Sequence, residues 1–259
     1  MKTNRDKRTI IISFIGFSLF LLLSKIFFTD VKEALDTFTK DGLASYILTY
    51  LIIGIPIFLC TYLINSENIF SALGLSGSIS KALIIAFIFS LPMLAGGLML
   101  NGIASDLNWR NLVAGTIVAG FVEELYYRGF FFGMLYKNTR FGFLSAILIG
   151  ALLFAFAHMY QSQDTMKLVG IFAITFMGAG LYAWLYVEWN YNLWVPIFLH
   201  TFMNLVWRLS DMGDTVLGGL WPNMLRALTI AFAIIGTILY KKRQDQELAI
   251  NLRNLIVKS

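Results

Sequence analysis

Apolar segments about as long as a membrane-spanning helix recur along the whole chain, and this feature restricts the possible folds more than any other. Of the 259 residues, 58% are hydrophobic and 14% are charged, whereas about a quarter of the residues in a typical soluble domain are charged. A segment in lipid must satisfy its backbone hydrogen bonds, and a helix does so by itself. The sequence therefore predicts an all-α fold, a polytopic bundle of transmembrane helices.

Eight spans can be placed in the sequence, each close to the ~20 residues that a helix needs to cross the hydrocarbon core. No soluble domain, internal repeat or low-complexity linker separates them, so we expect a single integral membrane domain over residues 1–259. The predicted spans are Thr9–Phe28, Leu43–Ile64, Ala82–Leu100, Leu112–Leu135, Phe141–Met159, Leu168–Val187, Leu193–Leu209 and Met224–Tyr240.

The distribution of Lys and Arg predicts how the chain is oriented. Basic residues gather before Thr9, after the fourth span at Lys137 and Arg140, and in the segment 241–259. With eight spans these three regions fall on one side, and positively charged flanks favour the cytoplasm. Both termini are therefore expected to be cytoplasmic, with 241–259 as a cytoplasmic tail. The tail fits either a short amphipathic helix on the membrane surface or a solvated segment.

The net charge of +5 arises from these flanks of the spans, so it does not indicate nucleic-acid binding. The expected partners are membrane lipid and a substrate that reaches the bilayer. A small chain without a targeting signal favours the bacterial plasma membrane.

The fourth predicted span contains ionisable residues, which are costly inside a membrane and often functional. Glu124 and Arg128 are four residues apart, so they share a helix face and can form an ion pair. Glu123 points about 100° away from this pair. An unpaired carboxylate in an apolar site is suited to general acid or base chemistry. A purely structural clamp between helices would explain the pair but leaves Glu123 unexplained.

Both histidines of the chain, His158 and His200, fall in predicted spans. His200 and Asn204 are four residues apart, so they share a helix face and present two adjacent hydrogen-bond donors. Such a pair is suited to stabilise an oxyanion, although a histidine in a span is more often a packing residue. Pro196 has no N–H to donate to the carbonyl of Asn192, so a kink is expected just before His200.

Three short patterns thus stand in separate spans: Glu-Glu-x-x-x-Arg-Gly at 123–129, Phe-x-x-x-His at 154–158, and His-x-x-x-Asn at 200–204. Together and in this order they resemble the CPBP family, the CAAX proteases and bacteriocin-processing enzymes that are also called Abi proteins. The resemblance covers roughly the fourth to the seventh span. A catalytic core at about residues 112–209 is expected on this basis.

The resemblance implies an intramembrane endopeptidase that hydrolyses a peptide bond with a glutamate-activated water and without a metal cofactor. It assigns Glu123 as the general base, and His158 as a residue that helps to hold the water. His200 and Asn204 would form the oxyanion hole for the tetrahedral intermediate.

The resemblance further implies that Glu124 and Arg128 orient the site. The substrate would be a prenylated or membrane-associated peptide or protein, such as a bacteriocin or pheromone precursor.

Three alternatives remain open at the level of sequence. Glu123, His158 and His200 form a set of two histidines and one carboxylate that is able to hold zinc, which would make a metalloprotease. The chain would otherwise be a non-catalytic immunity or membrane regulatory protein of the same fold. A transporter with a proton relay fits least, because the sequence has no two related halves with broken helices.

Overall fold

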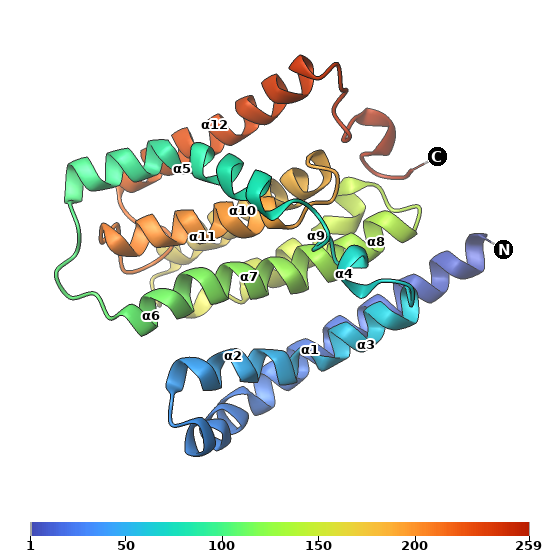
Figure 1. Cartoon of the computed structure of the whole chain (residues 1–259), viewed down its shortest axis with the longest axis horizontal. Coiled ribbons are helices and arrows are strands. Elements are labelled where there is room, and N and C mark those ends of the chain that lie inside the picture. Colours follow the sequence, from blue (N-terminus) through green and yellow to red (C-terminus); the bar gives the residue numbers. More distant parts are fainter. Residues whose placement is uncertain (1, 259) are drawn as a thin grey trace.

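Long helices run side by side through the computed structural model of the chain, which describes residues 2–258 (Figure 1). Residues 1 and 259, the ends of the predicted single domain, lie outside the described residues. Within this part of the chain the only strand-like pairing is an isolated bridge between Phe141 and Val257. The prediction of an all-α helical bundle is confirmed.

Several helices begin at a side chain whose oxygen accepts hydrogen bonds from the first backbone N–H groups, as Asp41 does for α2 and Asp164 does for α10. The elements in chain order are α1 (Lys2–Thr39), α2 (Gly42–Ile53), α3 (Ile55–Ile64), α4 (Ile69–Ala72), α5 (Ile79–Asn101), α6 (Trp109–Val113), the π-helical η1 (Ala114–Val118), α7 (Ala119–Glu123), the π-helical η2 (Glu124–Phe132), α8 (Gly133–Asn138), α9 (Phe143–Phe156), the single turn η3 (Met159–Gln161), α10 (Thr165–Glu188), α11 (Trp194–Leu209), α12 (Leu220–Arg243) and the single turn η4 (Leu252–Asn254).

Each of the eight predicted spans coincides with one helix or with consecutive helical segments. Six helices of the described chain are long and apolar enough to cross a membrane. The other two predicted spans differ: α11 has only 16 residues, and the helix from α6 to α8 contains Glu123, Glu124 and Arg128. A count of eight spans therefore stays a prediction. The six helices are Asn4–Thr39, Gly42–Ile64, Ile79–Asn101, Phe143–Gln161, Thr165–Glu188 and Leu220–Arg243.

The continuous helix from α6 to α8 lies at the centre of the bundle (Figure 1). Its segments contact α1 and α3 on one side, and α9, α10 and α11 on the others. Beyond α11, α5 packs against both α11 and α12. The ionisable residues of this central helix are thus surrounded by other helices, which is where a membrane protein tolerates them.

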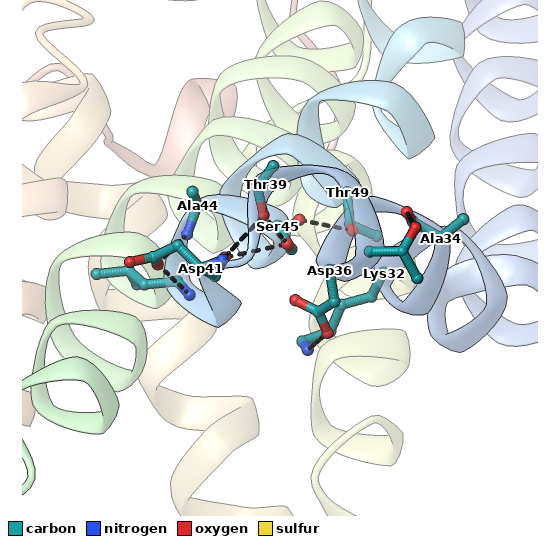
Figure 2. A network of polar contacts seen from close by, with 10 residues as sticks. Lys32, Ala34, Asp36, Thr39, Asp41, Ala44, Ser45 and Thr49 are labelled. Atoms are coloured by element: carbon teal, nitrogen blue, oxygen red, sulfur yellow. Dashed lines mark hydrogen bonds and ion pairs between the residues drawn. The ribbon is translucent and has the colours of Figure 1, made fainter.

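A polar network fixes the turn between α1 and α2 (Figure 2). Asp41 Oδ1 accepts hydrogen bonds from the N–H groups of Leu43 and Ala44, and the hydroxyls of Thr39 and Ser45 lie 2.7 Å apart. The N–H groups of Ala44 and Leu43 hold the pKa of Asp41 below its usual range. The turn therefore gives the first residues of α2 a fixed position beside α1.

The chain ends lie at the same end of the bundle, as the even number of predicted spans requires (Figure 1). Arg140, in the turn between α8 and α9, forms an ion pair with Asp6 of α1 at 3.3 Å. The backbone N–H of Lys258 donates to the carbonyl of Arg140 at 2.9 Å. The cytoplasmic location of this end stays a prediction.

The C-terminal segment after α12 forms neither of the two structures considered for it. Of its described residues, 244–258, only η4 is helical, and the segment packs on the bundle as an irregular strap. Its Leu255 and Ile256 carbonyls accept hydrogen bonds from Leu144 N–H and Gly142 N–H at the start of α9. Because the first N–H groups of a helix have no partner within the helix, the strap completes α9.

Candidate active site

The two adjacent glutamates lie where the central helix changes from α-helical to π-helical geometry. Glu123 is the last residue of α7, and Glu124 is the first residue of η2. Short π-helical segments are rare and occur often at functional sites. The central helix also approaches α11 closely here. A Cβ added to Gly120 would lie only 2.6 Å from Thr201 Oγ1, so the two helices could not be this close with a larger residue at that position. The absence of a side chain at Gly120 thus brings the glutamates close to α11.

Glu124 is fully buried and lies between a cation and a histidine. Its Oε1 is 3.3 Å from Arg128 Nη1, as the four-residue spacing predicted. The same oxygen is 2.8 Å from His200 Nδ1, on α11. In a hydrogen bond from the imidazole to a carboxylate oxygen, Nδ1–H of His200 is the donor and Glu124 Oε1 is the acceptor.

Arg128 is also fully buried, and its guanidinium makes no aligned hydrogen bond with the described residues. Its Cζ lies 4.4 Å from the ring centroid of Phe154 and 5.6 Å from that of Tyr182. The faces of aromatic rings attract a guanidinium. The charge of Arg128 is therefore offset by the ion pair with Glu124 and by the surrounding rings.

Glu123 differs from Glu124 in its exposure. Its side chain is 29% exposed, whereas that of Glu124 is 0% exposed. Glu123 Oε2 lies 3.8 Å from His200 Nε2. The two ring nitrogens of His200 therefore face two different carboxylates, one buried and one accessible.

The ring of His200 is held in place by stacking as well as by Glu124. Tyr182, on α10, stacks on it with ring centroids 4.8 Å apart and planes 14° from parallel. The Tyr182 hydroxyl donates to the sulfur of Met203 at 3.5 Å. These contacts leave the ring of His200 little freedom to rotate.

A cavity of about 1860 Å³ opens beside these residues. Four of the six residues that sequence patterns predicted for the site line it, whereas Glu124 and Arg128 lie behind its wall. The remaining lining is mostly apolar and aromatic and comes from the central helix, from α1, α2, α9, α10, α11 and α12, and from the loops before α6 and after α11. The four predicted residues in the wall are Glu123, His158, His200 and Asn204.

His158 lies just beyond the end of α9, within the stretch Phe143–Gln161 that is long and apolar enough to cross a membrane, as predicted. Its Nδ1 is 2.7 Å from the carbonyl oxygen of Phe154. A carbonyl only accepts, so Nδ1 carries the proton and the Nε2 of the neutral ring is a hydrogen-bond acceptor. His158 and Glu123 line the same cavity but make no direct hydrogen bond in the described structure.

Asn204 lies one turn of α11 beyond His200, and its Nδ2 donates to the carbonyl of Gly115 at 3.3 Å. One of its two amide hydrogens is therefore engaged with η1, and the other is available toward the cavity. The kink predicted at Pro196 is absent, because α11 begins at Trp194. Pro196 thus falls in the first turn, where an N–H is not required.

Within residues 2–258, no group of three His, Cys, Asp or Glu side chains is arranged to hold a metal ion. Glu123, His158 and His200, the set considered for zinc, line the same cavity, but their side chains are not close enough together to bind one metal ion in this arrangement.

The segment that contains these residues matches a known family. Residues 105–206 match the model described as type II CAAX prenyl endopeptidase Rce1-like. This segment is therefore similar to the CAAX proteases of the CPBP family. The chain is also 36% identical over 93 residues to the protein named "Putative membrane peptidase YdiL" of Bacillus subtilis (strain 168).

That match covers 36% of this chain and about a third (34%) of the length of the curated relative. No solved structure matches the chain. The segment that matches the family model contains all six site residues that the sequence patterns singled out.

Sequence reasoning missed three residues that position the site. Tyr182 stacks on His200, Gly120 permits the approach of α11, and Gly115 meets Asn204. None of them carries a sequence signal of its own, because each acts through a partner far away in the chain.

Proposed function

We propose that this protein is an intramembrane endopeptidase in which Glu123 activates a water for attack on a peptide bond. The observation that carries the proposal is the contrast between the two glutamates. Glu123 is accessible in a large cavity, whereas Glu124 is buried and bound to His200 and Arg128. The match of residues 105–206 to the type II CAAX prenyl endopeptidase model supports a membrane protease of the CAAX type.

In the proposed reaction, Glu123 takes a proton from the water as the water oxygen bonds to the scissile carbonyl carbon. His158 Nε2 accepts a hydrogen bond from the other O–H of this water, which stays on the oxygen, because Nδ1 is engaged with the carbonyl of Phe154. Glu123 then gives its proton to the leaving nitrogen as the C–N bond breaks. The products are a new carboxyl terminus and a new amine.

The oxyanion is proposed to be stabilised by the Nε2–H of His200 and by an amide N–H of Asn204. Because Nδ1 already donates to Glu124, Nε2 carries a proton only when the ring is cationic.

The proposed substrate is a peptide or protein at the membrane, prenylated or otherwise apolar near the cleaved bond. The aromatic and aliphatic lining of the cavity supports this class, since it includes Phe20, Leu21 and Phe28 of α1 and Met177 of α10. A bacteriocin or pheromone precursor would fit the same chemistry. The proposed location is the bacterial plasma membrane, with membrane lipid as the partner and no cofactor in the reaction.

Comparative peptidomics of the host membrane and medium tests this function. Strains producing the wild type, Glu123→Ala, or the control Glu67→Gln, whose residue is exposed in a loop far from the cavity, would be compared. We expect one or more cleaved peptides with the wild type and the control that Glu123→Ala abolishes. A normally folded Glu123→Gln protein that keeps full biological activity would instead indicate the non-catalytic immunity or regulatory role.

A further inference from the structure

An arginine lies on the same face of α11 as the proposed oxyanion residues. His200, Asn204 and Arg208 follow one another at intervals of four residues, and all three line the cavity. Side chains spaced by four residues are neighbours along a helix. The cavity wall therefore presents a row of three nitrogen-bearing groups, with Arg208 at the end furthest from Glu124.

The guanidinium of Arg208 packs against a specific residue of the central helix, Gly115. A Cβ built on Gly115 would lie 2.4 Å from its Cζ and Nη2, so the group rests directly on the bare backbone of η1. Asn204 donates to the carbonyl of the same Gly115. One glycine thus places the Arg208 guanidinium beside the Asn204 amide.

Arg208 makes no hydrogen bond or ion pair within residues 2–258. The other arginine of the cavity, Arg226, is occupied, because it donates to Val216 O at 2.6 Å and to Asn223 Oδ1 at 3.2 Å. The acids that line the cavity are Asp106, Glu123, Asp211 and Asp214, and none of them lies within 4.0 Å of Arg208 in the described structure. Arg208 is therefore a cation with five donors available to an anion from outside the chain.

We infer that Arg208 binds the free carboxylate at the C-terminus of the substrate peptide. A planar guanidinium matches a carboxylate through two parallel hydrogen bonds. This inference rests on the proposed function and adds to it a recognition element.

The position of Arg208 also sets where cleavage falls. The eight residues from His200 to Arg208 correspond to about 12 Å along the helix. An extended peptide advances roughly 3.3 Å per residue. A carboxylate on Arg208 thus places the bond beside His200 roughly three to four residues from the C-terminus of the substrate.

Binding to the full-length Glu123→Gln protein tests the inference without requiring catalysis. The probes are two peptides with an S-farnesylated cysteine followed by three apolar residues, one ending in a free carboxylate and the other in a carboxamide. We expect the acid to bind about 10-fold more tightly than the amide, the usual size of a charge-assisted hydrogen bond. Adding Arg208→Gln should remove this preference, and Arg208→Lys should keep part of it.

Arg110→Gln is the matched control, because Arg110 pairs with Asp41 at 2.7 Å and does not line the cavity. It should keep the full preference for the acid. Equal affinity for the two peptides, binding of neither, or a preference that survives Arg208→Gln would overturn the inference. Repeating the measurement in neutral and in anionic lipid shows which anion Arg208 binds. If Arg208 binds lipid phosphate and not the peptide carboxylate, the inference is also overturned.

Failure of the proposed function gives a different result. If the wild type cleaves neither peptide while the binding preference persists and depends on Arg208, hydrolysis is rejected and the role of Arg208 stands. If the wild type cleaves both peptides equally well, hydrolysis stands and the role of Arg208 is rejected.

Discussion

His200 Nδ1 lies 2.8 Å from Glu124 Oε1, although the two residues are 76 positions apart in the chain. This bond joins α11 to the central helix at the point where both glutamates lie. It fixes which ring nitrogen of His200 donates to the buried carboxylate and leaves Nε2 facing Glu123. Glu124 is not itself accessible from the cavity, but it orients His200 so that Nε2 faces the accessible Glu123.

Removing the Glu124 charge should destabilise the protein strongly. In Glu124→Gln, the fully buried Arg128 loses its anionic partner, and an uncompensated buried charge typically costs about 3–5 kcal/mol. The double variant Glu124→Gln/Arg128→Met should recover much of this loss, because both charges are gone. Thermal unfolding in detergent measures the stability of the single and the double variant. A double variant less stable than Glu124→Gln alone would contradict the pairing.

The partly exposed pair between Lys32 Nζ and Asp36 Oδ2, 2.6 Å apart and visible in Figure 2, is the control. Water reaches and screens these side chains, which are 33% and 36% exposed, so their ion pair contributes little to stability. Asp36→Asn should leave the unfolding temperature unchanged within error. A loss as large as that of Glu124→Gln would mean that burial is not what distinguishes the two pairs.

Enlarging Gly120 should separate the glutamates from His200. In Gly120→Ala the new Cβ would lie 2.6 Å from Thr201 Oγ1 and 3.1 Å from the Thr201 backbone nitrogen, so α7 and α11 must move apart. Overpacking of this kind costs about 1–3 kcal/mol, and kcat should fall with it. Gly42→Ala is the control, because a Cβ there would meet only Asp36 Oδ1, at 4.0 Å, and Gly42 does not line the cavity. Unchanged activity in Gly120→Ala would show that the close approach is not needed.

The aromatic ring of Tyr182, and not its hydroxyl, should matter for activity. Tyr182→Phe keeps the ring that stacks on His200 and loses only the contact with Met203, so its kcat should stay within about twofold. Tyr182→Leu loses the stacking that orients the imidazole, and its kcat should fall about tenfold with little change in KM. Equal rates for the two variants, measured with the same peptide, would rule out this positioning role.

The C-terminal strap should depend on a buried ion pair. Lys241 Nζ lies 2.5 Å from Glu188 Oε2, and the same carboxylate accepts the N–H groups of Ala249 and Ile250. Glu188→Gln should cost about 3–5 kcal/mol and expose residues 244–258 to proteolysis. Limited proteolysis followed by mass spectrometry checks this. A strap that resists cleavage as well as the wild type would show that other contacts hold it.

The fold was predictable because its signals are local. A long apolar segment forms a helix wherever it lies in the bundle, so each predicted span coincides with helical structure. The ion pair between Glu124 and Arg128 was predictable for the same reason, since four residues separate partners on one helix face.

Features that depend on distant parts of the chain were not predictable. The spacing of His200 and Asn204 indicated a shared face, but nothing local shows that Glu124 occupies one nitrogen of His200 or that Gly115 occupies an amide hydrogen of Asn204. The prediction of a kink at Pro196 was wrong because the residues before Trp194 form a turn and not a helix. Pro196 therefore interrupts no helical hydrogen bond.

Hydrolysis of a farnesylated reporter peptide in water enriched in oxygen-18 tests the role of Glu123 most directly. Purified wild-type protein should produce a cleaved peptide whose new carboxyl terminus contains one oxygen-18 atom. Glu123→Gln should fold with an unchanged unfolding temperature and lose activity by at least about 10²-fold, while Glu67→Gln should retain it. A folded Glu123→Gln protein that releases the labelled product at the wild-type rate would contradict the account.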